Sequence, residues 1–190
     1  MKLLEDKIRK DGVVIGDDIL KVDSFLNHQV DCELLSAMAK EWKRLYEGTE
    51  ITKVLTIEAS GIGIAAFVGY EFKCPMVFAK KSQTRNLSYD VYSTIVTSFT
   101  HSCDYNVRVS KSYLNPGDKV LVIDDFLANG AAIEGLIDLV HQAGATVVGC
   151  GVAVEKAFEP GGDKIRKAGY RVESLARVKS MSETDGIQFI

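Results

Sequence analysis

The stretch VLVIDDFLANGAA, residues 120–132, joins an apolar run, two adjacent aspartates and a loop of small residues. The run 120–123 is typical of a strand that is covered on both faces. We expect Asp124 and Asp125 at the carboxyl end of this strand, because open α/β sheets place their ligand crevice there. The small residues that follow precede a helical pattern over 133–140. At such a helix start, backbone N–H groups can close on an anion such as phosphate.

The composition limits the classes of partner. The 190 residues are 46% hydrophobic and 26% charged, which is ordinary for a globular domain, and we expect one domain over 1–190. A net charge of −3 gives no electrostatic reason to expect nucleic acid or an anionic membrane as partner. The sequence shows no apolar run of membrane-spanning length and no signal-peptide core, so we expect a cytoplasmic protein. The four cysteines and three histidines are scattered, which does not predict a metal site.

Strand and helix patterns alternate through the middle of the chain. The strands are expected at 53–57, 75–79, 107–110, 120–124 and 146–155, and the helices at 31–47, 61–72 and 130–143. This alternation predicts an α/β fold, with a parallel sheet flanked by helices. The segments 1–30 and 156–190 do not clearly extend it, and we expect them to form a small hood lobe over the carboxyl edge. The stretch 80–106 lacks firm periodicity and is long enough to predict a flexible lid.

The central stretch also allows two other interpretations. A magnesium-dependent phospho-acceptor site would also place acids at a strand end, but it would not need the Ala-Asn-Gly loop. A dinucleotide-binding fold would need G-x-G-x-x-G after its first strand. The segment 61–66, Gly-Ile-Gly-Ile-Ala-Ala, lacks the last glycine of that pattern. The second interpretation is therefore weak.

Residues 120–132 resemble the phosphoribosyl-pyrophosphate (PRPP) signature of the type I phosphoribosyltransferases, which has four hydrophobic residues, two acids and a small-residue phosphate loop. The resemblance implies that the catalytic pair Asp124 and Asp125 holds the ribose hydroxyls, directly or through metal-bound water. It also implies that the loop cradles the 5′-phosphate; its residues are Ala128, Asn129, Gly130, Ala131 and Ala132. Further PRPP contacts are implied for Glu58, Ala59 and Ser60, where the family binds pyrophosphate on backbone amides, and for Lys80 and Lys81 at the start of the lid.

The chain departs from the family pattern at several positions. The family commonly has threonine at the positions of Asn129 and Ala132, and an arginine often found near Glu58 is absent. Many hypoxanthine-guanine enzymes have an aspartate at the position of Ala128. The chain therefore lacks that acid-base candidate, as adenine-type enzymes do.

Within this family the chain resembles the bacterial xanthine phosphoribosyltransferases most closely, in the segments 20–29, 123–130 and 169–177. The resemblance implies that Leu20, Asn27 and Lys156 line the base pocket. An ammonium group suits xanthine, which has oxo groups at C2 and C6 and becomes acidic near neutral pH. Asn27 can donate to an oxo group or accept from a ring N–H, and Leu20 can offer a backbone group and an apolar wall. Without the resemblance, these three would be interpreted as a core leucine, a turn asparagine and an exposed lysine.

The resemblance implies a purine-salvage transferase that converts xanthine and PRPP to xanthosine monophosphate and pyrophosphate. Mg²⁺ is expected to arrive bound to PRPP or pyrophosphate, with no protein-held metal site. The implied partners are these small molecules and a second copy of the chain, since the family is typically dimeric. The alternatives are a guanine or hypoxanthine phosphoribosyltransferase and a non-catalytic PRPP-sensing regulator. Such a regulator would need a basic DNA-binding module, for which the chain has neither spare length nor positive charge.

Overall fold

The computed structural model describes residues 1–81, 90–98 and 103–190. In chain order its elements are α1 (Lys2–Asp11), β1 (Val13–Ile15), β2 (Ile19–Lys21), the π-helix η1 (Asp23–Asn27), α2 (Cys32–Leu45), β3 (Lys53–Ile57), α3 (Gly61–Phe72), β4 (Met76–Ala79), β5 (Val91–Ser98), β6 (Cys103–Ser110), β7 (Lys119–Leu127), α4 (Ala131–Gln142), β8 (Thr146–Lys156), α5 (Gly161–Lys167), β9 (Val172–Ser182) and β10 (Gly186–Phe189).

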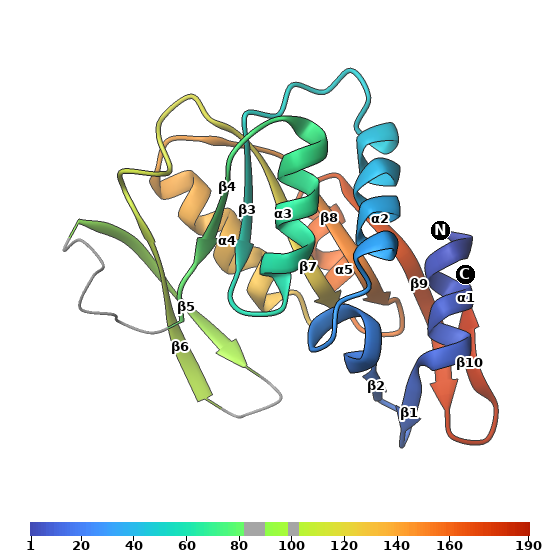
Figure 1. Cartoon of the computed structure of the whole chain (residues 1–190). Helices are drawn as coiled ribbons and strands as arrows, with labels where there is room; N and C mark the ends of the chain where they lie inside the picture. The colour runs from blue at the N-terminus through green and yellow to red at the C-terminus, as the bar shows by residue number, and fades with distance from the viewer. Residues whose placement is uncertain (82–89, 99–102) are drawn as a thin grey trace.

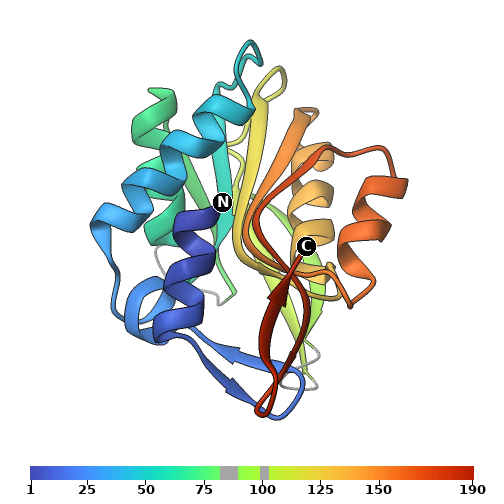
Figure 2. The same ribbon diagram turned by 90° about the vertical axis from the view of Figure 1, so that its right-hand side faces the viewer.

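A six-stranded sheet in the order β10-β9-β8-β7-β3-β4 forms the centre of the molecule. Its strands are parallel except β10, which pairs antiparallel with β9. Helices α1, α2 and α3 cover one face, and α4 and α5 cover the other (Figures 1 and 2). Because helices cover both faces of these parallel strands, β3 is buried throughout and residues 120–123 are fully inaccessible to solvent.

The predicted helices and strands of the central alternation are present. Helix α2 begins after Asp31, whose carboxylate accepts the N–H of Leu34 at 3.0 Å, as expected of an N-cap. Its buried stripe includes Trp42, which donates to the carbonyl of Glu173 in β9. These contacts fix α2 against the sheet.

The sequence predicted a strand at 120–124 that ends at the aspartates, and this end was wrong. Strand β7 continues past them and pairs with β8 as far as Leu127 opposite Glu155. Backbone pairing does not depend on the side chain, and successive side chains of a strand point to opposite faces. Asp124 can therefore be buried, at 4% exposure, while Asp125 is only half-buried.

Two further expectations were incomplete. The stretch 80–106 contains β5 and the start of β6, which pair antiparallel from Val91–Ser110 to Ser98–Cys103. The tail after Lys156 does extend the alternation, through α5 and then β9, which lies parallel to β8. Serine, threonine and charged residues within β5, β6 and β9 concealed both patterns. The expected lid also includes residues 82–89 and 99–102, which lie outside the described part of the chain, so its flexibility stays a prediction, as do the domain bounds.

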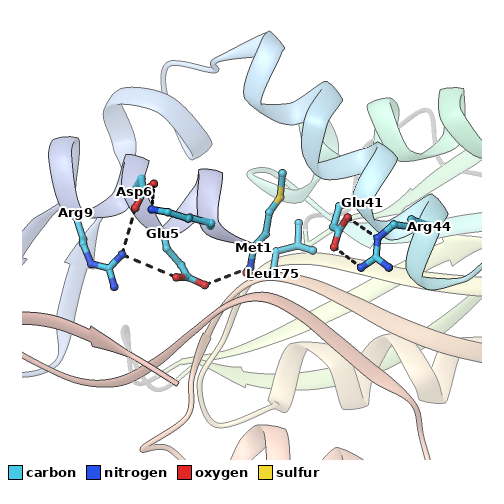
Figure 3. Close-up of polar contacts among 8 residues, drawn as sticks. Met1, Glu5, Asp6, Arg9, Glu41, Arg44 and Leu175 are labelled. Carbon is cyan, nitrogen blue, oxygen red and sulfur yellow. Dashed lines mark hydrogen bonds and ion pairs between the residues drawn. The ribbon is translucent and has the colours of Figure 1, made fainter.

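The N-terminal helix is held against the sheet by polar contacts (Figure 3). The α-amino group of Met1 donates to the carbonyl of Leu175 in β9 and to Oε1 of Glu5, the latter at 3.3 Å. Leu4 and Ile8 are fully buried beneath the helix. Helix α1 therefore belongs to the main core, and β1, β2 and η1 leave from its end toward the carboxyl edge of the sheet (Figure 1). Within the described residues, no helix has the length and apolar character needed to cross a membrane.

Candidate active site

The two aspartates of β7 differ in environment. Asp124 is buried, and its Oδ1 accepts the backbone N–H of Asp125 at 3.0 Å. Burial, followed by the charge of Asp125, raises the pKa of Asp124 well above its usual value. Asp125 is half-buried, and its Oδ1 accepts the N–H of Phe126 at 3.0 Å. The pair therefore joins one carboxyl group that resists ionisation with one that lies closer to solvent.

A predicted base-pocket residue meets the second aspartate directly. The side-chain amide of Asn27, at the end of η1, donates to Oδ2 of Asp125 at 3.2 Å. The π-helix is anchored by the buried side chains of Phe25 and Leu26. The structure therefore brings together two residues that the sequence analysis assigned to the base and to the ribose.

The loop after β7 forms a close turn into α4. Gly130 has a φ of +90°, a left-handed conformation that favours glycine, and it precedes the first residue of α4. Asn129 Oδ1 accepts the N–H of Ala131 at 2.9 Å, so its side chain satisfies the first backbone donor of α4. The remaining N–H groups of the first turn make the loop suited to an anion, because a helix start has unpaired donors and the positive end of the dipole.

A cavity of about 180 Å³ opens over this loop. All five loop residues from Ala128 to Ala132 line it, together with Phe126 and Leu127 of β7. Its lining also includes Lys81, and Thr97 and Tyr105 of the β5–β6 pair. The ammonium group of Lys81 lies 5.3 Å from the centre of the Tyr105 ring. The lining thus combines the backbone of a helix start with a cation, which is a suitable environment for a phosphate.

The loop after β3 lies next to the buried aspartate. A Cβ on Gly61 would lie 2.0 Å from Oγ1 of Thr56 and 3.5 Å from Oδ1 of Asp124, so these three groups meet in one small space. The Thr56 hydroxyl is buried and has no hydrogen-bond partner among the described residues. The Glu58–Ala59 peptide is cis, and Ser60 precedes α3 without a side-chain cap. The predicted pyrophosphate segment therefore borders the predicted ribose site.

The two lysines at the end of β4 face different pockets. Lys81 lines the phosphate-loop cavity, and its backbone N–H donates to Oε1 of Glu58 at 2.6 Å. Lys80 instead lines a separate cavity between β4 and β6, with Phe78 and Arg108. Its backbone pairs with Arg108 in an isolated bridge. The structure thus joins Lys81, but not Lys80, to the other predicted PRPP residues.

The other two predicted base-pocket residues, Lys156 and Leu20, come from β8 and β2. Lys156 is the last residue of β8, and its ammonium group donates to the carbonyl of Asp18 and lies 3.8 Å from Glu159 Oε1. Leu20 lies in β2 opposite Val14, and its side chain is 7% exposed and packs in the main core. The Leu20 side chain therefore belongs to the core, and its predicted contact with the base stays a prediction.

Two supporting features were missed by the sequence analysis. Gly161 donates its N–H to the carbonyl of Ala128 at 2.9 Å, and a Cβ there would lie 2.5 Å from the backbone nitrogen of Gly130. Glu155, beside Lys156, is 1% exposed and accepts two bonds of 2.7 Å from Arg166. The Pro-Gly-Gly sequence at 160–162 is a recognisable turn signal, but nothing in it predicts that it supports a loop 30 residues earlier.

The described residues gather no group of three His, Cys, Asp or Glu side chains that could hold a metal ion. The cysteines at 32, 74 and 150 are free thiols.

The sequence matches the model of the phosphoribosyl transferase domain over residues 22–184. The chain belongs to the phosphoribosyltransferase family. A xanthine phosphoribosyltransferase of Lachnoclostridium phytofermentans is 57% identical to it, over 98% of this chain and 96% of the relative. Enzymes with the same name from Bifidobacterium adolescentis and Latilactobacillus sakei are 56% and 51% identical, over 98% and 96% of this chain and 97% and 94% of their own lengths.

Solved phosphoribosyltransferases share the architecture. The Giardia lamblia adenine phosphoribosyltransferase complexed with 9-deazaadenine aligns with a TM-score of 0.78 and 25% identity, over 92% of this chain and 97% of that one. The enzyme of Thermoanaerobacter pseudethanolicus gives a TM-score of 0.75 at 21% identity, over 92% and 99%. The predicted fold class, an α/β phosphoribosyltransferase fold of type I, is confirmed.

Proposed function

We propose that this phosphoribosyltransferase transfers the phosphoribosyl group of PRPP to xanthine, giving xanthosine monophosphate and pyrophosphate. The observation that carries the proposal is the 3.2 Å contact between Asn27, the proposed base-pocket residue, and Asp125, the proposed ribose-binding residue. The identity of 51–57% to xanthine phosphoribosyltransferases over nearly the whole chain supports the choice of base.

In this proposal the site has three parts in a row along the carboxyl edge. The phosphate loop, residues 128–132, holds the 5′-phosphate, and Lys81 faces it across the cavity. Asp124 and Asp125 hold the ribose hydroxyls. The backbone from Glu58 to Ser60 takes the pyrophosphate, next to Asp124. Lys80 lines another cavity, so its proposed contact with PRPP would require the substrate or the lysine to reach across β4.

The base is proposed to lie between Asn27, Lys156 and the backbone of Leu20. The chain has Ala128 where a carboxylate would otherwise be available to move the base proton. Xanthine does not need that group as much as other purines do, because it already loses a proton near neutral pH. An ammonium group that favours the anion would therefore replace a general base, and we assign this role to Lys156.

Catalysis would then depend on positioning and electrostatics. The transition state should resemble a ribosyl oxocarbenium ion with charge leaving on pyrophosphate. Phosphate oxygens are ligands that suit Mg²⁺, and Asp124 and Asp125 would hold the ribose hydroxyls directly or through water bound to that ion. Mg²⁺ bound with pyrophosphate would neutralise leaving-group charge. The β5–β6 pair, whose Thr97 and Tyr105 line the cavity, would exclude water from the reacting centre.

We further propose that the enzyme acts as a cytoplasmic homodimer. The support is family resemblance together with large apolar side chains that are exposed around β4–β6, namely Phe78, Ile95 and Tyr113. Static light scattering of the purified chain at several concentrations would test it. A mass twice 20.8 kDa supports the dimer, and a mass of one chain at all concentrations contradicts it.

The proposed activity is tested by incubating the enzyme with PRPP, Mg²⁺ and each of xanthine, guanine, hypoxanthine and adenine, with the nucleotide product identified by chromatography. We expect kcat/KM to be highest for xanthine. A higher kcat/KM for guanine or hypoxanthine would change the substrate but keep the reaction. Absence of any nucleotide would exclude the reaction itself.

A further inference from the structure

The hairpin of β1 and β2 is held at its tip by two side chains from the other end of the chain. Glu183, in the turn between β9 and β10, accepts the backbone N–H of Gly16 at 2.8 Å. Lys156 donates to the carbonyl of Asp18, two residues further along the same tip. Figures 1 and 2 both show this hairpin beside the end of β9 and β10. The two contacts span 167 and 138 residues of chain.

The hairpin needs such support because its own pairing is short. Each strand has three residues, and only three residue pairs face each other. A two-stranded hairpin of this length is marginal by itself in water. Leu20 anchors one strand in the core, while Val13, Ile15 and Ile19 are exposed. The position of the tip therefore depends on the contacts that Glu183 and Lys156 make with it.

The tip in turn sets the orientation of Lys156. An ammonium group has three donors, and the Asp18 carbonyl takes one of them. The carboxylate of Glu159, at 3.8 Å, lies on another side. If Asp18 moves, the ammonium group loses the acceptor that fixes its direction. The bond between Glu183 and Gly16 keeps Asp18 in place, since Gly16 lies two residues before it in the same turn.

We propose that Glu183 is a positioning residue of the base pocket, which holds the hairpin tip so that Lys156 presents its remaining donors to the base. This inference rests on the proposed function, in which Lys156 faces xanthine. Glu183 acts here as a hydrogen-bond acceptor and not through its charge. The tip already carries the negative charges of Asp17 and Asp18 and offers Glu183 only a backbone N–H, so a neutral acceptor at residue 183 should serve equally well.

The test compares three variants of the full chain. Glu183→Ala removes the acceptor, and Glu183→Gln keeps a carbonyl oxygen in its place. Asp185→Ala is the matched control, because Asp185 lies in the same turn and bonds with Ser182 within it. The measurements are KM for xanthine at saturating PRPP, KM for PRPP at saturating xanthine, and Tm.

We expect Glu183→Ala to raise the KM for xanthine about two- to tenfold, the range of one lost hydrogen bond, while the KM for PRPP stays unchanged and Tm falls by no more than about 2–4 °C. Glu183→Gln and Asp185→Ala should match the wild type. If the wild type converts xanthine but Glu183→Ala has an unchanged KM for xanthine, or raises both KM values equally, the positioning role is excluded and the proposed function stands. If the wild type does not convert xanthine, the proposed function fails, and the positioning role fails with it.

Discussion

The side-chain amide of Asn27 lies 3.2 Å from Oδ2 of Asp125, although 98 residues of chain separate them. One residue comes from the N-terminal segment and the other from the central strand. If Asn27 contacts the base and Asp125 the ribose, as proposed, a change at Asn27 should also affect the binding of PRPP. In that case this hydrogen bond would couple the binding of xanthine to the binding of PRPP.

Replacing Asn27 with aspartate tests this coupling. The new carboxylate would face Asp125 at hydrogen-bond distance, and like charges there should push the two side chains apart. We expect kcat/KM to fall about tenfold or more for both xanthine and PRPP, a loss of about 1.4 kcal/mol. Gln29→Glu adds the same charge two residues away and is the control. Equal effects of the two substitutions would contradict a specific link between Asn27 and Asp125.

Asp124→Asn should separate stability from activity. Burial raises the pKa of Asp124 in the folded protein, so the ionised form is disfavoured there relative to the unfolded chain. The stability that this group contributes is present below its unfolded pKa, near 3.8, and is lost as the pH rises through the folded value. At neutral pH the amide should therefore raise Tm, by about 2–4 °C for each 1 kcal/mol relieved.

Thermal unfolding of Asp124→Asn without substrates, followed by steady-state rates, measures both effects. Asp125→Asn is the control, since Asp125 is only half-buried and should gain less in Tm. Both variants should lose activity. A lower Tm for Asp124→Asn at neutral pH would show that the ionised carboxylate stabilises the free enzyme.

Because Gly161 at the start of α5 contacts the loop 128–132, we expect Gly161→Ala to impair both PRPP binding and folding stability. The added Cβ would meet the carbonyl of Ala128 at 2.3 Å and the nitrogen of Gly130 at 2.5 Å, both of them backbone atoms that cannot turn aside. We expect the KM for PRPP to rise and Tm to fall. Gly63→Ala is the control, because its Cβ would be 3.7 Å from Leu35 in a helix, where alanine is favoured. If the two variants have the same KM for PRPP, α5 does not shape the loop.

Much of the fold follows from local sequence patterns. The N-cap Asp31, the alternation of apolar strands with amphipathic helices, and the signature at 120–132 each have a physical cause that acts over a few residues. Glu155 shows what local patterns do not predict. Its partners Arg166, Ser174 and Arg177 come from other elements, and nothing near it in the chain predicts a buried carboxylate. Likewise, Asn27 would be interpreted as a turn residue by itself, and only the fold places it against Asp125.

Glu155 should also make the folding stability depend on pH in the acid range. Burial would raise its pKa, but hydrogen bonds from Arg166 and Ser174, with the charges of Arg166 and Arg177, outweigh burial and lower the pKa from 4.5 to about 2. Because the folded pKa is lowered, the stabilisation is present above about pH 4.5 and is lost as the pH falls toward 2. The contribution is roughly 3 kcal/mol.

Urea unfolding between pH 5 and pH 2.5 measures this contribution. Glu155→Gln should be less stable than the wild type at pH 5, because two arginines lose their buried partner, and the difference should shrink toward pH 2.5. Glu134→Gln removes an exposed partner of Lys164 and should keep the slope of the wild type. A constant difference between Glu155→Gln and the wild type at every pH would mean that Glu155 does not carry the acid dependence.

The central claim is that Lys156 selects xanthine through the negative charge that this base gains near neutral pH. Lys156→Met keeps the aliphatic stem and removes the ammonium group, and Lys164→Met removes an exposed ammonium group as the control. The decisive measurement is kcat/KM for xanthine and hypoxanthine from pH 6 to 9. We predict that Lys156→Met loses about ten- to a hundredfold for xanthine and less for hypoxanthine, with a gap that widens as xanthine ionises. Equal losses for the two bases at every pH would contradict the claim.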